Sequence, residues 1–88
     1  MDLRFELLSF ASALKQSYVL ENARDKLAPI LVHAEKLQLD SATIAERCNV
    51  SSFKLAKWKS GELKAEQSEA QAVIDHICRL ALEEQDKL

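Results

Sequence analysis

The sequence contains very little glycine, proline or cysteine. One glycine and one proline in 88 residues leave almost no material for tight turns and bulges, which disfavours a β-sheet fold. The two cysteines form no CxxC pair, and the two histidines are not spaced from them as metal ligands would be. We therefore expect no disulfide scaffold, no zinc or other metal site and no cofactor. Two free thiols suit a reducing cytoplasm, where we expect the protein to be.

Long apolar runs and catalytic motifs are also missing. No apolar stretch approaches the roughly 18–20 residues that a membrane span needs, so we expect no membrane partner. The short apolar segment 7–14 is preceded by two acidic residues and one arginine, so it lacks the positive segment of a secretion signal. The chain has no glycine-rich phosphate loop, no nucleophile beside a base and no preorganised carboxylate pair. We expect it not to be an enzyme.

The residues that are abundant favour helices. Alanine, leucine, glutamate and lysine dominate, with 48% hydrophobic and 30% charged residues, which is typical of a globular helical domain. We predict one all-α domain over residues 1–88. The apolar spacing predicts five helices, at residues 2–21, from Pro29 to 38, 41–48, 52–60 and 66–84.

The first predicted helix carries one apolar stripe. Its members follow 4-3-4 spacing, and they are Leu3, Leu7, Phe10 and Leu14. This stripe is a candidate dimer interface, although it could equally pack on the core of its own domain. We expect the chain to break over residues 22–28 after this helix, where Asn22 can act as a cap. Pro29 belongs either in the first turn of the next helix or at a kink.

The most informative stretch is residues 41–62. Asp40 or Ser41 can cap a short helix, and Ser51 or Ser52 can cap a second one. Asn49 lies between them, where the chain must turn sharply, and asparagine tolerates the left-handed conformation. Gly61 is placed as a C-terminal cap. The pattern predicts two short helices joined by a tight turn, with apolar residues facing inward.

Charge is unevenly distributed along the chain. The net charge is −2 overall, but residues 1–38 are neutral, residues 39–65 carry +2 and residues 66–88 carry −4. The positive excess therefore falls on the two-helix stretch, as expected of a nucleic-acid-binding surface. The acidic C-terminal helix would repel DNA, so it should lie away from such a surface.

This stretch resembles the phage repressor and Cro family of helix-turn-helix domains, often called the XRE family. That family commonly has Leu-Ala-x-x-x-Gly-Val-Ser, a short helix with an apolar residue and Trp, and then Gly-Glu. The corresponding residues are Ile44, Ala45, Asn49, Val50, Ser51, Leu55, Trp58, Gly61 and Glu62. The match is ungapped over about 20 residues. It implies a lambda-repressor-like domain with residues 26–62 as the helix-turn-helix core, residues 66–85 as the C-terminal helix and residues 1–21 as an extra N-terminal helix.

The resemblance also implies which residues contact DNA. Residues 52–59 would be the recognition helix in the major groove, with base contacts from Ser52, Phe53, Lys54 and Lys57. The backbone contacts would come from Ser41, Thr43, Lys59, Ser60 and Lys64. Phe53 stands where many relatives carry a polar residue, so it could contact a thymine methyl or bind a protein partner.

Two functions follow as expectations. The first is a sequence-specific double-stranded DNA-binding transcriptional regulator of a phage or bacterium, acting as a homodimer on an inverted repeat. The second is a protein-interaction module, such as an antirepressor or antitoxin-like partner, that reuses the helix-turn-helix fold. The acidic balance of the chain and an exposed Phe53 favour the second.

Overall fold

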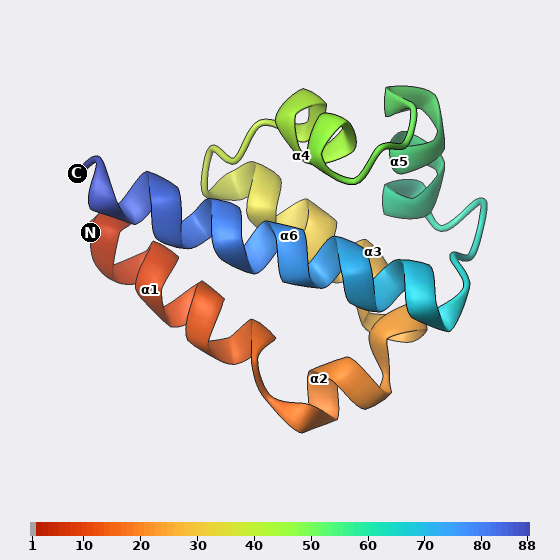
Figure 1. Cartoon of the computed structure of the whole chain (residues 1–88), viewed down its shortest axis with the longest axis horizontal. Coiled ribbons are helices and arrows are strands. Elements are labelled where there is room, and N and C mark those ends of the chain that lie inside the picture. The colour runs from red at the N-terminus through yellow and green to blue at the C-terminus, as the bar shows by residue number, and fades with distance from the viewer. Residues whose placement is uncertain (1) are drawn as a thin grey trace.

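The computed structural model describes residues 2–88 and is built from α-helices, with no strand in that range. These residues form six helices, labelled in Figure 1, in the order α1 (Leu3–Leu14), α2 (Ser17–Glu21), α3 (Ala23–Lys36), α4 (Ser41–Arg47), α5 (Ser52–Ser60) and α6 (Gln67–Asp86). The predicted all-α class is confirmed. The helix count is not, because the N-terminal segment forms two helices rather than one.

Helix α6 is the centre of the fold. It runs antiparallel to α1, so the first and last described helices lie side by side, with the start of α1 beside the end of α6 (Figure 1). Helices α3 and α4 also pack on α6, and α5 packs on α3 and α4. The most deeply buried large side chains come from α1, α3 and α6, namely Leu7, Leu27, Ile74 and Ile77. The α4–α5 pair therefore sits as an outer layer on a core built by the longer helices.

The predicted helix over residues 2–21 is interrupted at Lys15 and Gln16. Helix α1 starts at the Asp2 cap, whose carboxylate accepts from the Arg4 amide, but it ends at Leu14, and α2 begins at Ser17. The apolar spacing continues through the break, so periodicity alone could not locate it. The end of α2 is anchored from far along the chain, because the Leu20 carbonyl accepts a 2.9 Å hydrogen bond from the Gln67 side chain.

Pro29 neither begins a helix nor ends one. The break expected over residues 22–28 is wrong beyond Asn22, because helix α3 starts at Ala23 and continues through Pro29 to Lys36. A proline inside a helix leaves one carbonyl of the preceding turn without its amide partner. Pro29 is exposed, so water can satisfy that carbonyl, and packing of Leu27 and Leu31 into the core keeps the helix continuous.

The stripe proposed as a dimer interface faces its own domain. Leu7, Phe10 and Leu14 are at most 8% exposed, and Leu3 packs at the edge of the same core. The stripe covers α6, which has a complementary apolar face, so most of its surface packs within the chain. Of the two alternatives that the spacing left open, packing on its own core therefore accounts for most of the stripe, and only Phe10 and Leu14 also line an open groove beside α3. The large apolar side chains that α1 does expose are Phe5 and Leu8.

Candidate nucleic-acid interface

Helices α4 and α5 are joined by a turn whose local signals act as predicted. The Asp40 carboxylate accepts from the Ala42 amide at the start of α4. Asn49 adopts φ +57°, and the following amide, Val50, donates to the Ala45 carbonyl at 3.0 Å. The Ser51 hydroxyl then accepts from the Lys54 amide and starts α5. Each bond satisfies a backbone group that a helix end would leave unpaired.

The inward faces of the two helices form one small core. Ile44, Ala45, Leu55 and Trp58 are each at most 3% exposed, and Cys48 and Val50 pack against them at the edge. Ala45 allows the two helices to approach closely. Trp58 is buried as predicted, and its indole Nε1 has no hydrogen-bond partner among the described residues. Gly61 ends α5 at φ +84°.

The outward face of α5 combines an aromatic ring with two lysines. Phe53 is 73% exposed, and the Lys57 ammonium lies 5.0 Å from its ring centre. The Lys54 ammonium lies 5.1 Å from the Trp58 ring centre. Ser52 is exposed in the first turn of α5. The structure thus places all four predicted base-contact residues on one short helix, but the side chains of Lys54 and Lys57 are only 41% and 38% exposed.

Each lysine predicted to touch DNA already has a carboxylate partner in the same chain. Lys54 pairs with Glu69 at 3.2 Å, and Lys57 pairs with Glu62 at 2.9 Å. The other two pairs are Lys59 with Glu35 and Lys64 with Asp25. These side chains are between 36% and 66% exposed, so each pair contributes little to stability and can exchange for another anion.

The partner carboxylates make the surface around α5 less positive than the net charge of residues 39–65 suggests. Glu69 lies on α6 and Glu35 on α3, so the positive excess counted along residues 39–65 is partly neutralised by residues outside that segment. A hydrogen bond from the Glu66 backbone, and then one from Lys54, hold the pKa of Glu69 below its usual value. The spacing of charges in the sequence does not indicate these carboxylates, except that Glu62 lies only five residues after Lys57.

The predicted DNA-backbone contacts do not form one group. Ser41 and Lys59 line the same small cleft, of about 50 Å³, where the starts of α4 and α5 meet α3, together with Ser52, which was predicted as a base contact. Thr43 instead donates its hydroxyl proton to Asp40 at 3.1 Å. Ser60 donates to the Lys57 carbonyl at 3.1 Å. Lys64 lies in the segment after α5 and pairs with the carboxylate of an α3 residue.

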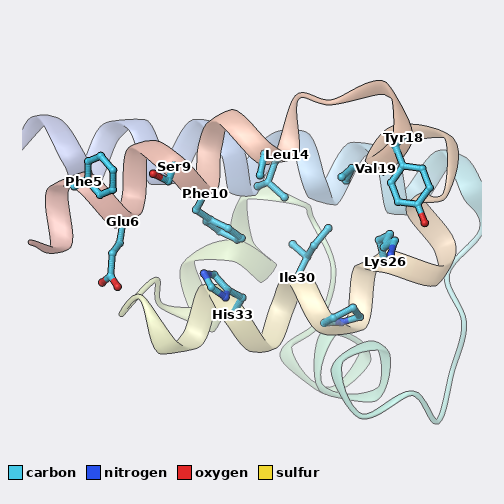
Figure 2. Close-up of a pocket in the computed structure, with 12 residues that line it drawn as sticks. Phe5, Glu6, Ser9, Phe10, Leu14, Tyr18, Val19, Lys26, Ile30 and His33 are labelled. Carbon is cyan, nitrogen blue, oxygen red and sulfur yellow. The ribbon is translucent and has the colours of Figure 1, made fainter. Parts of the chain in front are cut away.

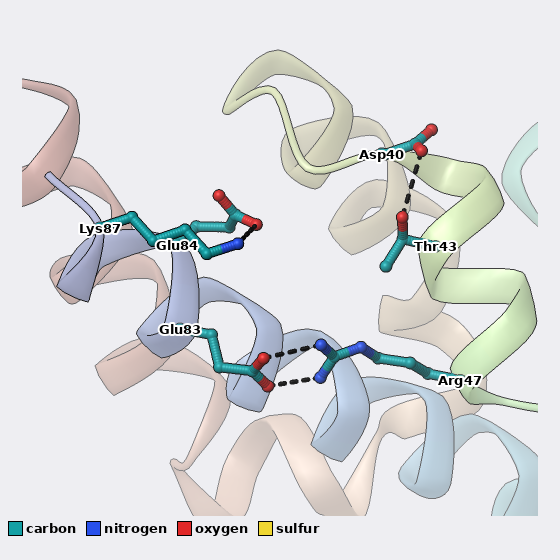
Figure 3. A network of polar contacts seen from close by, with 6 residues as sticks. All are labelled: Asp40, Thr43, Arg47, Glu83, Glu84 and Lys87. Atoms are coloured by element: carbon teal, nitrogen blue, oxygen red, sulfur yellow. Dashed lines mark hydrogen bonds and ion pairs between the residues drawn. The ribbon is translucent and has the colours of Figure 1, made fainter.

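An arginine that the sequence did not single out ties α4 to α6. Arg47 donates from both terminal nitrogens to the two carboxylate oxygens of Glu83, as Figure 3 shows. This two-bond pair is the strongest geometry available to these side chains. The Arg47 guanidinium, through its hydrogen bond, holds the pKa of Glu83 below its usual value. The pair fixes the outer layer to the central helix at the opposite end of α4 from its Asp40 cap.

The two cysteines are free thiols. Burial raises the pKa of Cys48 to about 11 and also raises the pKa of Cys78, so both thiols remain protonated near neutral pH. Cys78 donates to the Ala11 carbonyl at 3.4 Å, between α6 and α1. Both cysteines therefore serve packing rather than nucleophilic chemistry.

Comparison of the chain with protein-family models, curated proteins and solved structures finds no match in any of the three. The resemblance of residues 44–62 to the repressor and Cro family therefore stays a prediction from the motif. Within residues 2–88, no helix has both the length and the apolar character needed to cross a bilayer. The same residues bring together no group of three His, Cys, Asp or Glu side chains that could hold a metal ion.

Proposed function

We propose that the protein is a sequence-specific double-stranded DNA-binding regulator that inserts α5 into the major groove. One observation carries the proposal. The turn at Asn49 and the shared core under Trp58 hold α5 as a rigid outer helix, with Ser52, Phe53 and Lys57 on its outward side. Lysine can donate to guanine, and a phenyl ring can contact a thymine methyl.

The ion pairs of α5 are compatible with DNA binding, provided that they can be broken when DNA binds. Binding must exchange the Lys57–Glu62 and Lys54–Glu69 pairs for contacts with DNA. Both pairs are exposed, so the exchange costs little. The carboxylates would also disfavour non-specific binding to phosphate, because they lower the positive potential of the free protein. A DNA ligand and two free thiols fit a reducing compartment that holds DNA, which is the cytoplasm of a bacterial or phage-infected cell.

The test is selection from random duplex DNA with the purified, folded chain. Enrichment of an inverted repeat is expected, and its half-site spacing reports how two α5 helices are placed. On the selected duplex, Lys57→Ala and Lys54→Ala should each weaken binding by about 1–3 kcal/mol if the residue contacts a base. Lys15→Ala, at an exposed position beyond the end of α1, is the matched control and should leave affinity unchanged.

A second function is supported by one specific observation. Phe53 is exposed among lysines that are already neutralised by carboxylates, which suits an interface with another protein as well as it suits a base contact. In that case α5 would bind an antirepressor or antitoxin-like partner. The two functions differ in their response to salt. DNA binding should weaken steeply as salt rises, whereas a contact centred on Phe53 should change little.

A further inference from the structure

An open groove lies far from α5 in sequence and is lined by none of the predicted DNA-contact residues. It has a volume of about 610 Å³ and lies between α1 and α2 on one side and α3 on the other. Its floor is apolar, with Phe10, Leu14 and Ile30 at the centre (Figure 2). An uncovered apolar groove on a chain of this size marks an interaction site.

Two exposed aromatic rings and two opposite charges mark the ends of the groove. Phe5 and Glu6 lie at one end, and Tyr18 and Lys26 lie at the other, as Figure 2 shows. Phe5 is 67% exposed and Tyr18 61%. Among residues 2–88, neither Glu6 nor Lys26 forms an ion pair, although Lys26 lies 5.0 Å above the Tyr18 ring. The groove is therefore acidic at one end, basic at the other and apolar between them.

This arrangement is complementary to itself. A two-fold axis that crosses the groove from α1 to α3 exchanges its ends, so Glu6 of each copy faces Lys26 of the other. An axis along the groove would place Glu6 against Glu6 and Lys26 against Lys26, which is repulsive. Two-fold dimers use the same patch on both copies and require this kind of self-complementarity. We propose that the groove is the homodimer interface, occupied by a second copy of the chain with Phe5 of each copy packed against the other groove.

The favoured axis also suits the proposed function, on which this inference builds. Helix α5 packs on α3, on the side of α3 away from α1. Rotation about an axis running from α1 to α3 keeps both α5 helices on the same side of the dimer. Both can then face one DNA duplex, and two copies related by a two-fold axis match an inverted repeat.

The experiment measures self-association without DNA. Sedimentation velocity of the wild-type chain, up to roughly 100 µM so that a weak dimer is visible, is expected to show a dimer. Glu6→Lys and Lys26→Glu each turn two attractive pairs into two repulsive ones and should weaken the dimer by roughly tenfold or more. An equimolar mixture of these two variants restores both attractive pairs, so it should dimerise as the wild type does. Glu21→Lys and Lys36→Glu make the same charge changes at exposed positions outside the groove and should leave the dimer intact.

Several results would overturn the interface. A monomeric wild type refutes it and leaves the groove for a small apolar ligand or another protein. If both charge variants dimerise as the wild type does, any dimer contact lies elsewhere. If the mixture does not recover dimerisation, Glu6 of one copy does not face Lys26 of the other, and the proposed arrangement is refuted. Phe5→Ser, at a mostly exposed position, tests the apolar part if a charge variant fails to fold by circular dichroism. A monomer that still selects a DNA half-site would refute this interface alone, whereas a dimer that selects no DNA would refute the proposed function alone.

Discussion

Glu62→Gln should raise the affinity of the protein for its DNA site. Lys57 lies 2.9 Å from Glu62, and the two side chains are 38% and 63% exposed. An exposed pair of this kind contributes about 0.2–1 kcal/mol, and DNA binding must give up that interaction before Lys57 can reach a base or phosphate. Glutamine removes most of this cost and also removes one negative charge near the phosphates. The expected gain is about 0.5–1 kcal/mol, or roughly two- to fivefold in Kd.

The assay is a fluorescence-anisotropy titration of a selected duplex at fixed salt, with four proteins in a cycle. They are the wild type, Glu62→Gln, Lys57→Ala and the double variant. The gain from Glu62→Gln should largely disappear in the Lys57→Ala background, because no lysine is then released. Glu46→Gln, at an exposed position on α4, controls for the general loss of negative charge. The reasoning is refuted if Glu62→Gln leaves affinity unchanged, or if its full gain survives in the absence of Lys57.

Two further predictions concern the scaffold. Ala45→Leu should lower the free energy of unfolding by about 1–3 kcal/mol in urea titrations, because overpacking separates α4 from α5. Ala42→Leu, at an exposed position on the same helix, should change the free energy of unfolding little. Equal effects of the two substitutions would contradict the close approach of the helices at Ala45. Glu83 has a folded pKa below its ordinary value of 4.5 because of Arg47, so its contribution is present above that value and is lost as pH falls through the lower folded pKa. Glu83→Gln should therefore be less stable than wild type at pH 7, with the gap closing on acidification; a gap independent of pH would show that the carboxylate charge is not responsible.

Features set by a few neighbouring residues were predictable. The caps at Asp40 and Ser51, the left-handed turn at Asn49 and the end of α5 at Gly61 each depend on the local backbone preference of one residue type. The buried positions of Ile44 and Trp58 followed from helical spacing for the same reason. Because α5 is delimited by such local signals, the candidate site could be located from sequence alone.

Features set by distant contacts were not predictable. Spacing showed that α1 has an apolar face but not what covers it, and in the structure most of that face packs on α6. No glycine or proline lies at the break after Leu14, so no helix-breaking residue indicates it in the sequence. The partners of Lys54 and Lys59 come from α6 and α3, so their neutralisation depends on packing between segments far apart in the chain. The groove is lined by residues of α1, α2 and α3, so it depends on how three helices pack together.

The antiparallel packing of α1 against α6 has a consequence for how the chain is made. These two helices flank residues 15–66 in the sequence, so their contact closes the longest loop in the fold, and such contacts form late. During synthesis from the N-terminus, the apolar stripe of α1 has no cover until α6 emerges from the ribosome. The nascent chain therefore presents an open hydrophobic surface until α6 is available, and we expect chaperone contact and aggregation of chains that lack α6 to centre on α1.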